Sequence, residues 1–375
     1  MTPTLSTSQA AGVAKIHDWL ATPSRVRSQE FRFFGTAGTG KTTAIATAVA
    51  EADLNMAYIA FTGKAASVMR RNGIDAQTLH SLIYRRVDDC PITGKPRFER
   101  AKRHDVGRFD LIVLDECSMI GTKMAEDLLS FDIPVLAIGD PAQLPPVSGG
   151  AGLGYFTRGK PDVLLTEVHR QAADNPILKL ATQARQGETL KYGNYGDSRV
   201  LFSGDIDPDE LWGADQVIVG TNATRARLNK RAREHYGMVD MYPMFGDKII
   251  CIRNNPAHGI FNGEMFTVIR CEQTSPAWLS LDVVRLEDPT REVIAGIKVH
   301  TSMFTGGSKP EESTLSGSAQ FDFGYAITAH KAQGSQWDDL VVIDESKVFR
   351  EMKDKWLYTA ITRAAKTITI GKGRI

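Results

Sequence analysis

Short apolar runs alternate with amphipathic stretches along the first half of the chain. Four of these runs have the length and composition of buried strands: Phe31–Phe34, Ala57–Phe61, Leu111–Leu114 and Val135–Ile138. Helical patterns cover Thr42–Ala52 and a stretch that ends at Arg71. Fully apolar runs separated by helices are typical of βαβ units, so the first half is predicted to form a parallel sheet.

A similar pattern begins again in the second half. Gln216–Val219 reads as a strand, and Leu340–Ile343 and Thr367–Ile370 supply further strands. Arg225–Tyr236 is predicted to be a helix, and we interpret its row of basic residues as a solvated face. The doubled pattern suggests two related α/β halves.

The segment from Lys248 to His300 departs from this alternation. Four strand-like runs follow one another with turn residues between them and no helical period: Lys248–Ile252, Met265–Cys271, Leu279–Leu286 and Val293–Val299. This arrangement predicts a small antiparallel barrel inserted into the second α/β unit. Thr301–Ser318 is rich in Gly, Ser and Thr and is predicted to be the loop that returns to the host domain.

Composition agrees with a globular protein of two to three domains. The chain has 375 residues, 42% of them apolar and 24% charged. Its 45 basic and 44 acidic residues leave a formal net charge of +1. Because such a balance does not attract phosphates in bulk, nucleic-acid binding would require basic residues that are grouped locally.

Neither a membrane span nor a secretory signal is expected. No stretch approaches the ~18 uninterrupted apolar residues of a membrane helix, and Met1–Ala11 is polar. The four cysteines are scattered, without a C-x-x-C pair: Cys90, Cys117, Cys251 and Cys271. We therefore expect no disulfide and no zinc site, in a reducing cytosol.

A phosphate-binding loop follows the first predicted strand. Gly35–Thr42 satisfies G-x-x-x-x-G-K-[ST] and opens a helix, the context in which this motif binds a nucleotide. Its glycines let backbone N–H groups curl around phosphate oxygens. Lys41 is expected to reach the β and γ phosphates, and Thr42 to supply a hydroxyl to Mg²⁺.

Two further strands end in side chains suited to hydrolysis. Asp115 and Glu116 follow an apolar run; the first can hold Mg²⁺ through water and the second can deprotonate the attacking water. Gln143 lies in Gly139–Val147 and could sense the γ-phosphate. Taken alone, the acidic pair is also compatible with an ordinary turn, and Gln143 with a rigid solvated loop.

These blocks, in this order, resemble the superfamily-one DNA helicases, most of all the RecD- and Dda-like group that moves 5′ to 3′. The similarity spans nearly the whole chain. Segments that resemble the leading glutamine motif and motifs Ia, Ib, II, III, IV, V and VI are, in turn, Leu5–Gln9, Phe61–Ala66, Ala76–His80, Asp115–Met119, Gly139–Val147, Leu165–Gln171, Phe323–Gly334 and Tyr358–Ala364.

The resemblance implies a role for individual residues at the nucleotide. Gln9 would read adenine, Gln143 would couple the γ-phosphate to DNA, and Arg170 and Arg363 would reach the transferring phosphoryl group from the second domain. The expected nucleotide-binding residues are Gln9, Gly35, Thr36, Ala37, Gly38, Thr39, Gly40, Lys41, Thr42 and Thr43. The expected Mg²⁺ ligands are Thr42 and Asp115, and the expected catalytic residues are Lys41, Asp115, Glu116, Gln143, Arg170 and Arg363.

DNA contacts implied by the resemblance are Thr62, Gly63, Lys64 and His80 in the first domain, and Thr328, His330 and Lys331 in the second. In this family an insertion near residues 84–107 forms a pin that splits the duplex. Here the segment is basic and has a hairpin tip at Pro91–Pro96, with Phe98 as a candidate for base stacking. A solvated basic loop with Phe98 packed inward is the alternative.

The predicted architecture is α/β, with two RecA-like P-loop domains, an SH3-like barrel and a short pin. We expect the first RecA-like domain over 1–158, the second over 159–243 and 320–375, the barrel over 244–319 and the pin over 84–107. The implied activity is ATP-dependent unwinding of DNA with Mg²⁺, by a cytoplasmic monomer acting on single strands and junctions without sequence specificity. Replication or recombination proteins are candidate partners. The alternatives are a DNA-stimulated ATPase switch or assembly factor, an RNA helicase, and a P-loop phosphotransferase, which would leave motifs V and VI unexplained.

Overall fold

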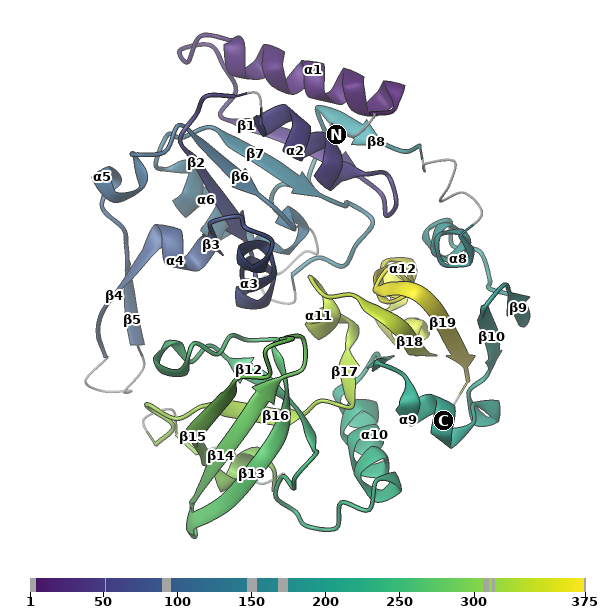
Figure 1. Cartoon of the computed structure of the whole chain (residues 1–375). Coiled ribbons are helices and arrows are strands. Elements are labelled where there is room, and N and C mark those ends of the chain that lie inside the picture. The colour runs from purple at the N-terminus through teal and green to yellow at the C-terminus, as the bar shows by residue number, and fades with distance from the viewer. Residues whose placement is uncertain are drawn as a thin grey trace.

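Three sheets organise the chain in the computed structural model, which describes residues 5–50, 52–89, 96–146, 154–167, 175–305, 310–311 and 314–373. Two are mainly parallel and are covered by helices, and a smaller antiparallel sheet lies beside them (Figure 1). We call these the first α/β part (5–167), the second α/β part (175–243 and 326–373) and the small sheet (248–323).

The first α/β part holds a six-stranded sheet in the order β3-β2-β6-β7-β1-β8, in which every neighbouring pair is parallel. Its strands are β1 (Glu30–Gly35), β2 (Met56–Ala60), β3 (Ala76–Thr78), β6 (Leu111–Leu114), β7 (Val135–Gly139) and β8 (Val163–Leu165). Its helices are α1 (Thr7–Ala21), α2 (Lys41–Ala50), α3 (Gly63–Arg71), α4 (Leu79–Ile83), α5 (Arg103–Val106) and α6 (Thr122–Leu129).

Both faces of this sheet are buried, which explains why its central strands are apolar at every position. In β6, Leu111 and Val113 pack with α1 and α2, while Ile112 and Leu114 pack with α4 and α6 on the other face. A strand that must satisfy two cores cannot alternate polar and apolar residues.

The second α/β part repeats the plan in the order β17-β11-β18-β19-β10-β9, and only the edge strand β9 is antiparallel. Its strands are β9 (Gly193–Tyr195), β10 (Ser198–Phe202), β11 (Gln216–Val219), β17 (Ala326–Thr328), β18 (Trp337–Asp344) and β19 (Ala364–Lys372). Its helices are α8 (Pro176–Arg185), α9 (Pro208–Gly213), α10 (Asn222–His235), α11 (Ala329–Ala332) and α12 (Lys353–Ile361). The two predicted parallel sheets are thus present.

The small sheet is antiparallel, in the order β15-β14-β13-β12-β16. Its strands are β12 (Lys248–Arg253), β13 (Met265–Ser275), β14 (Trp278–Arg285), β15 (Val293–His300) and β16 (Gln320–Phe323). The four predicted strands are confirmed, and β16 is a fifth. A bridge between Val299 and Ala319 brings the two edges of the sheet together.

A two-stranded hairpin projects from the first α/β part. It consists of β4 (Tyr84–Asp89) and β5 (Pro96–Arg100), and Phe98 faces Arg86 across it. Most of the predicted tip, Pro91–Pro96, lies outside the described residues. Single 3₁₀ segments connect other elements: η1 (Cys117–Met119), η2 (Ser203–Asp205), η3 (Pro256–His258), η4 (Thr301–Met303) and η5 (Ser346–Met352).

The interpretation of the Arg225–Tyr236 helix as a solvated face is wrong for two of its arginines. Arg233 is buried, and its guanidinium donates to Asp247 at 3.0 Å, while Arg225 forms an ion pair with Asp322. The helix therefore joins the second α/β part to the small sheet. Among the described residues, no helix has both the length and the apolar character needed to cross a membrane.

Candidate nucleotide site and nucleic-acid groove

The phosphate-binding loop occupies the turn between β1 and α2. Gly38 and Gly40 take φ values of +76° and +69°, which are costly for residues with a side chain. Lys41 Nζ folds back and donates to the carbonyl oxygens of Gly35 at 2.7 Å and Thr36 at 3.1 Å. The ammonium group thus lies inside the curve of the loop, where a phosphate would sit.

Gln9 supports this loop from α1. Ser6 and Gln9 form a capping box at the start of the helix, and the Gln9 carboxamide nitrogen donates to the carbonyl oxygens of Thr39 at 3.0 Å and Gly40 at 3.4 Å. The side chain is almost fully buried. These contacts bring Gln9 to the nucleotide loop, and its reading of adenine stays a prediction.

The acidic pair lies at the end of β6. Burial raises the pKa of both carboxyl groups, and the positive charge of Lys41 opposes that rise in each. Asp115 Oδ1 accepts a hydrogen bond from Glu116 N at 2.8 Å. Glu116 has φ +53° and ψ +40°, a left-handed conformation that is strained for glutamate and is often found at functional sites.

Arg363 approaches the acidic pair from the second α/β part. Its charge opposes the rise in the pKa of Glu116 across the interface between the two parts. The guanidinium is buried and donates to Thr359 O at 3.2 Å, Thr362 Oγ1 at 3.2 Å and Ser335 O at 3.4 Å. Arg170, the other predicted arginine, lies outside the described residues.

Gln143 follows β7 in the loop Asp140–Pro146. Its side chain is buried, and its Oε1 has no hydrogen-bond partner within the described ranges. The backbone N–H of Gln143 donates to Asp140 O at 3.2 Å and fixes the turn. This oxygen is therefore an acceptor available to a group that the chain itself does not supply, such as a water molecule, and the role of Gln143 at the γ-phosphate stays a prediction.

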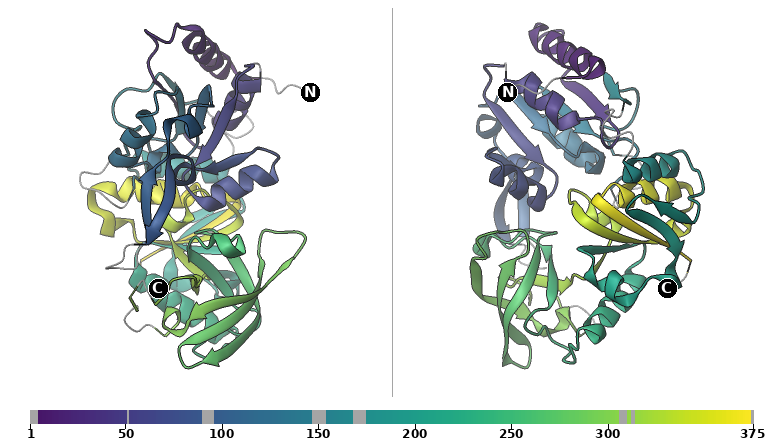
Figure 2. Two further views of the ribbon diagram at one scale, coloured as in Figure 1. Left: turned by 90° about the vertical axis from the view of Figure 1, so that its left-hand side faces the viewer. Right: turned by 45° about the vertical axis from the view of Figure 1, so that its right-hand side comes forward.

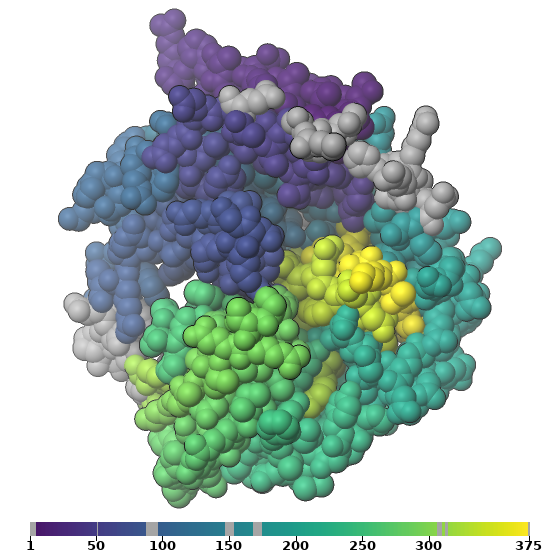
Figure 3. Space-filling model, in the orientation of Figure 1, coloured from purple at the N-terminus to yellow at the C-terminus, as the bar shows by residue number. Residues whose placement is uncertain are grey.

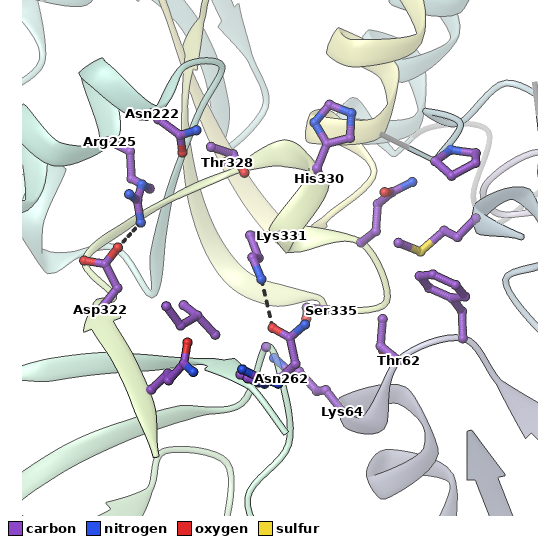
Figure 4. A pocket seen from close by; sticks show the side chains of 18 of the residues that line it. Thr62, Lys64, Asn222, Arg225, Asn262, Asp322, Thr328, His330, Lys331 and Ser335 are labelled. Carbon is purple, nitrogen blue, oxygen red and sulfur yellow. Dashed lines mark hydrogen bonds and ion pairs between the residues drawn. The ribbon is translucent and has the colours of Figure 1, made fainter. Parts of the chain in front are cut away.

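A groove of about 980 Å³ runs where the two α/β parts and the small sheet meet. Polar side chains from all three line it (Figure 4). The first part contributes Thr62 and Lys64; the second contributes Asn222, Arg225, Thr328, His330, Lys331, Gln333 and Ser335; the small sheet and its turns contribute Arg253, Asn262, Gln320 and Asp322.

Threonines at strand ends form a repeated feature of the groove. Thr62 caps α3, and its hydroxyl accepts from Ala65 N at 3.1 Å; Thr328 lies directly before α11. Lys331 Nζ donates to Asn262 Oδ1 at 2.8 Å across the groove (Figure 4). Burial lowers the pKa of His330, so its imidazole is neutral near pH 7. Neutral polar groups and helix N-termini are suited to phosphate contacts without sequence readout.

Two other predicted DNA contacts, Lys64 and Gly63, pack against the small sheet. Lys64 is only 5% exposed at its side chain, and its Nζ lies 2.6 Å from Glu287 of the small sheet. Gly63 lies against Phe261, which leaves no room for a Cβ atom. These contacts close the groove on the side of α3, where the space-filling view shows the small sheet touching the first α/β part (Figure 3).

His80 and Phe98 are absent from the lining of the groove among the described residues. Their rings pack edge to face with centroids 4.6 Å apart at the base of the hairpin, and Phe98 remains 48% exposed. The alternative in which Phe98 packs inward is therefore wrong. An exposed aromatic ring at this position can still meet a base.

Sequence reasoning missed several groove residues. Asn222 and Arg225 lie in the first turn of α10, directly after β11, and the position after a parallel strand was the available signal. Asn262 belongs to an Asn-Gly turn between two apolar runs, which signals a turn but not a groove. Asp322 is found only through its ion pair with Arg225.

Comparison with known proteins agrees with this arrangement. Residues 9–203, more than half of the chain, match the family described as AAA domain, and residues 323–370 match the UvrD-like helicase C-terminal domain. The chain belongs to this AAA-domain family, within the RecD-like superfamily-one helicases. The matched segments contain the phosphate-binding loop, the acidic pair, Thr328 and Arg363.

Individual relatives show how far the similarity extends in this helicase group. The ATP-dependent RecD2 DNA helicase of Deinococcus radiodurans is 29% identical over 362 residues, which are 88% of this chain and 45% of that protein. The RecBCD enzyme subunit RecD of Mycobacterium tuberculosis is 26% identical over 390 residues, covering 90% of this chain and 65% of that subunit. This chain therefore spans about half to two thirds of these relatives.

Solved structures support the fold. The crystal structure of Bacteroides Pif1 bound to ssDNA superposes with a TM-score of 0.57 at 17% identity, covering 98% of this chain and 92% of that one. A structure of Pif1 helicases at forked dsDNA gives a TM-score of 0.58 at 18% identity, with the same coverage. At this level of identity, the likeness establishes a shared architecture of two α/β parts and no more.

Proposed function

We propose that this chain is an ATP-dependent DNA helicase that moves 5′ to 3′ on single-stranded DNA and separates duplexes at junctions. One observation supports this most: the interface between the two α/β parts carries the hydrolytic residues at one end and the polar groove at another. Any change in the gap between the parts therefore acts on both. The proposal is also favoured by the ATP-dependent DNA helicase activity of the RecD2 relative and by the ssDNA in the Pif1 structure.

In the proposed reaction, the phosphate-binding loop holds ATP and Lys41 leaves its carbonyl partners for the β and γ phosphates. Water attacks the γ-phosphorus, Glu116 accepts the water proton, and the bond from the γ-phosphorus to the bridging oxygen breaks to leave ADP and phosphate. Arg363 stabilises the charge that spreads over the γ-phosphoryl oxygens. Gln143 orients the water or senses the γ-phosphate.

The residues present also fit Mg²⁺. Thr42 offers a hydroxyl and Asp115 a carboxylate, and oxygen donors of this kind are the ligands that Mg²⁺ prefers. Bound there, the ion would neutralise charge on the β and γ phosphates. The described part of the chain holds no group of three or more His, Cys, Asp or Glu side chains that could bind a metal ion by themselves.

On the nucleic-acid side, we propose that the strand crosses the groove from the first α/β part to the second. Thr62, Thr328 and the adjoining backbone N–H groups would hold phosphates, and Asn222 and Arg225 join them. Such contacts release counterions, so log affinity should fall against log salt with a slope of roughly −0.7 per phosphate. Lys64 becomes available only when Glu287 releases it.

We propose the domain division given by the sheets. The first RecA-like domain extends from 1 to about 167, beyond the expected end at 158, because β8 pairs with β1, and the hairpin near 84–107 is its pin. The second domain covers the following segment up to 243 and the C-terminal segment. Because β16 pairs with β12, the small, SH3-like domain extends from 244 to about Phe323, beyond the expected end at 319, and the second domain resumes near Ala326. We propose a cytoplasmic monomer.

Tailed duplexes test this proposal. We expect strand release with ATP and Mg²⁺ from a duplex with a 5′ overhang, and none from a blunt duplex or one with a 3′ overhang. Hydrolysis stimulated by DNA without strand release would support an ATPase switch or assembly factor instead. Faster release from an RNA tail than from a DNA tail would support an RNA helicase.

A further inference from the structure

The loop Asp140–Pro146 follows a strand of the first α/β part but is bound by the second. Leu144 is 1% exposed and belongs to the apolar core formed by α8, α12, β18 and β19. Its backbone N–H donates to Thr359 Oγ1 at 2.9 Å, and its carbonyl accepts from Gln333 Nε2 at 2.9 Å. Lys355 Nζ donates to Pro141 O at 2.8 Å. The loop is therefore fixed to motifs V and VI of the opposite part.

Tyr358, on α12, links this loop to the phosphate-binding loop. Its hydroxyl donates to Asp140 Oδ2 and accepts from the backbone N–H of Ala37 at 2.9 Å. Both Tyr358 and Asp140 are almost fully buried. Burial and the adjacent carboxylate raise the pKa of Tyr358, so the phenol keeps the proton that it donates.

The two partners of this hydroxyl belong to the nucleotide machinery. Ala37 is the third residue of the phosphate-binding loop, and Asp140 begins the turn that carries Gln143. Asp140 Oδ1 also accepts from Ala142 N at 2.9 Å, which fixes the conformation of that turn. One oxygen atom of the second part thus holds a phosphate-binding amide and the Gln143 turn in a single arrangement.

Packing alone does not require this hydroxyl. The ring of Tyr358 fills the core around α8 and α12, and phenylalanine would fill it equally. Leaving the Asp140 carboxylate and the Ala37 amide without this partner would change their positions while the apolar contacts stay. If removing the Tyr358 hydroxyl alone lowers ATP hydrolysis, the cause is therefore the altered position of these two groups and not a loss of packing.

We propose that Tyr358 acts through its hydroxyl as a positioning residue for ATP hydrolysis, an inference that rests on the proposed function. It sets Gln143 and the phosphate-binding loop relative to each other only when the two α/β parts are closed. Gln333 lines the groove and donates to the carbonyl of Leu144 in the same loop. A strand bound in the groove would therefore act, through Gln333, on the loop that carries Gln143.

The test compares Tyr358→Phe with Tyr192→Phe, a matched loss of one hydroxyl from an exposed tyrosine outside both sites. Steady-state ATP hydrolysis is measured with and without oligo(dT), together with oligo(dT) affinity and melting temperature. For Tyr358→Phe we expect kcat in the presence of oligo(dT) to fall about tenfold, with KM for ATP and oligo(dT) affinity within about twofold of wild type. Tyr192→Phe should match the wild type.

A double-mutant cycle with Asp140→Ala separates positioning from general damage. If the pair is coupled, Tyr358→Phe should cost clearly less activity in the Asp140→Ala background than in the wild type, because only its contact with Ala37 is then left to lose. Fully additive losses, a wild-type kcat in Tyr358→Phe, or a parallel fall of kcat and melting temperature would each overturn the inference. An inactive wild-type chain would instead sink the proposed function itself.

Discussion

The two parallel sheets carry nearly the same skeleton and use it differently. Read along their strand orders, β3-β2-β6-β7-β1 of the first sheet corresponds to β17-β11-β18-β19-β10 of the second. The edge strands β3 and β17 both end in a threonine that precedes a short helix with histidine at its second position: Thr78 with His80, and Thr328 with His330. The corresponding turns after β2 and β11 place Thr62 and Thr221 as helix caps.

The central strands show the difference most clearly. β6 is followed by Asp115 and Glu116, and β18 ends at Asp344, which Glu345 follows. Glu345 turns inward and accepts from Gly220 N at 2.7 Å, Thr221 N at 3.0 Å and Thr224 Oγ1 at 2.6 Å. The carboxylate of Glu345 thus satisfies the N-terminal end of α10. The carboxylate of Glu116 instead lies close enough to Arg363 and Lys41 for both positive charges to oppose the rise in its pKa.

The strands that would carry the nucleotide differ as well. β1 leads into the glycine-rich loop, but β10 leads into the short turn Ser203–Asp205, which has no such loop. The repeated α/β plan thus supplies, in both halves, strand-end turns that can bind an anion. Local sequence then decides whether the chain fills a turn with its own carboxylate or leaves it for a phosphate.

The largest loss of ATP hydrolysis should come from removing Lys41, the phosphate-binding lysine that only the first sheet carries. Lys41→Ala removes the cation that the phosphates require, so ATP hydrolysis should fall by at least about a hundredfold while oligo(dT) still binds. Steady-state hydrolysis and fluorescence anisotropy measure the two properties. Lys160→Ala, at an exposed lysine, is the control; full hydrolysis in Lys41→Ala would refute the assignment of the loop.

Glu116→Gln should lower ATP hydrolysis without lowering stability, and this would distinguish Glu116 from Glu345 at the corresponding strand of the second sheet. The amide cannot accept the water proton, so hydrolysis should fall about 10² to 10⁴-fold. Because burial raises the pKa of Glu116 in the folded state, removing the charge should leave the free energy of unfolding at pH 7 unchanged or slightly higher. A destabilised Glu116→Gln would contradict the division of roles.

Glu345→Ala should produce the opposite pattern. It leaves the partly buried backbone N–H groups of Gly220 and Thr221, directly before α10, without an acceptor, and this should cost about 2 kcal/mol of unfolding free energy. Urea denaturation measures this change. ATP hydrolysis per folded molecule should stay close to wild type in this variant. Glu345→Gln, which keeps one acceptor oxygen, is the control and should lose less stability. Lost activity at unchanged stability would show that Glu345 serves the reaction.

The smallest effect concerns pH. Because burial raises the pKa of Glu116 and a general base must be deprotonated, hydrolysis should fail as the pH is lowered through that raised pKa. The acid limb of kcat/KM should therefore lie above the ordinary glutamate value of about 4.3. A profile from pH 4 to 8, restricted to the range where circular dichroism shows the fold intact, locates the limb. An acid limb at or below the ordinary glutamate value would contradict Glu116 as a base with a raised pKa.

Sequence reasoning succeeded where a pattern is long or chemically narrow. The apolar runs of β1, β6, β7 and β18 and the phosphate-binding loop were predicted because burial on two faces and phosphate binding each permit few residue types. The three-residue strands β3, β8, β9 and β17 escaped prediction because tertiary pairing, not composition, makes them strands.

Contacts between distant parts of the chain were beyond reach for the same reason. Lys64 was predicted as a DNA contact from its motif, but nothing near it in the sequence indicates Glu287, which lies 223 positions later and binds it in the structure. The arginines of α10 were interpreted as solvated because their partners, Asp247 and Asp322, belong to the small sheet. A sequence motif indicates which chemical groups are present, whereas ion pairs between domains depend on how the domains pack.

The position of Leu144 has a consequence for dividing the molecule. Its side chain completes the core of the second α/β part although the first part provides it. The two parts lie beside each other in the ribbon views of Figure 2. A chain cut after residue 167, at the end of the first α/β part, would leave that leucine exposed on one fragment and a vacancy of about one side chain in the other. The two halves should therefore be poorly soluble when expressed apart and should recover when expressed together, so they are complementary fragments and not interchangeable modules.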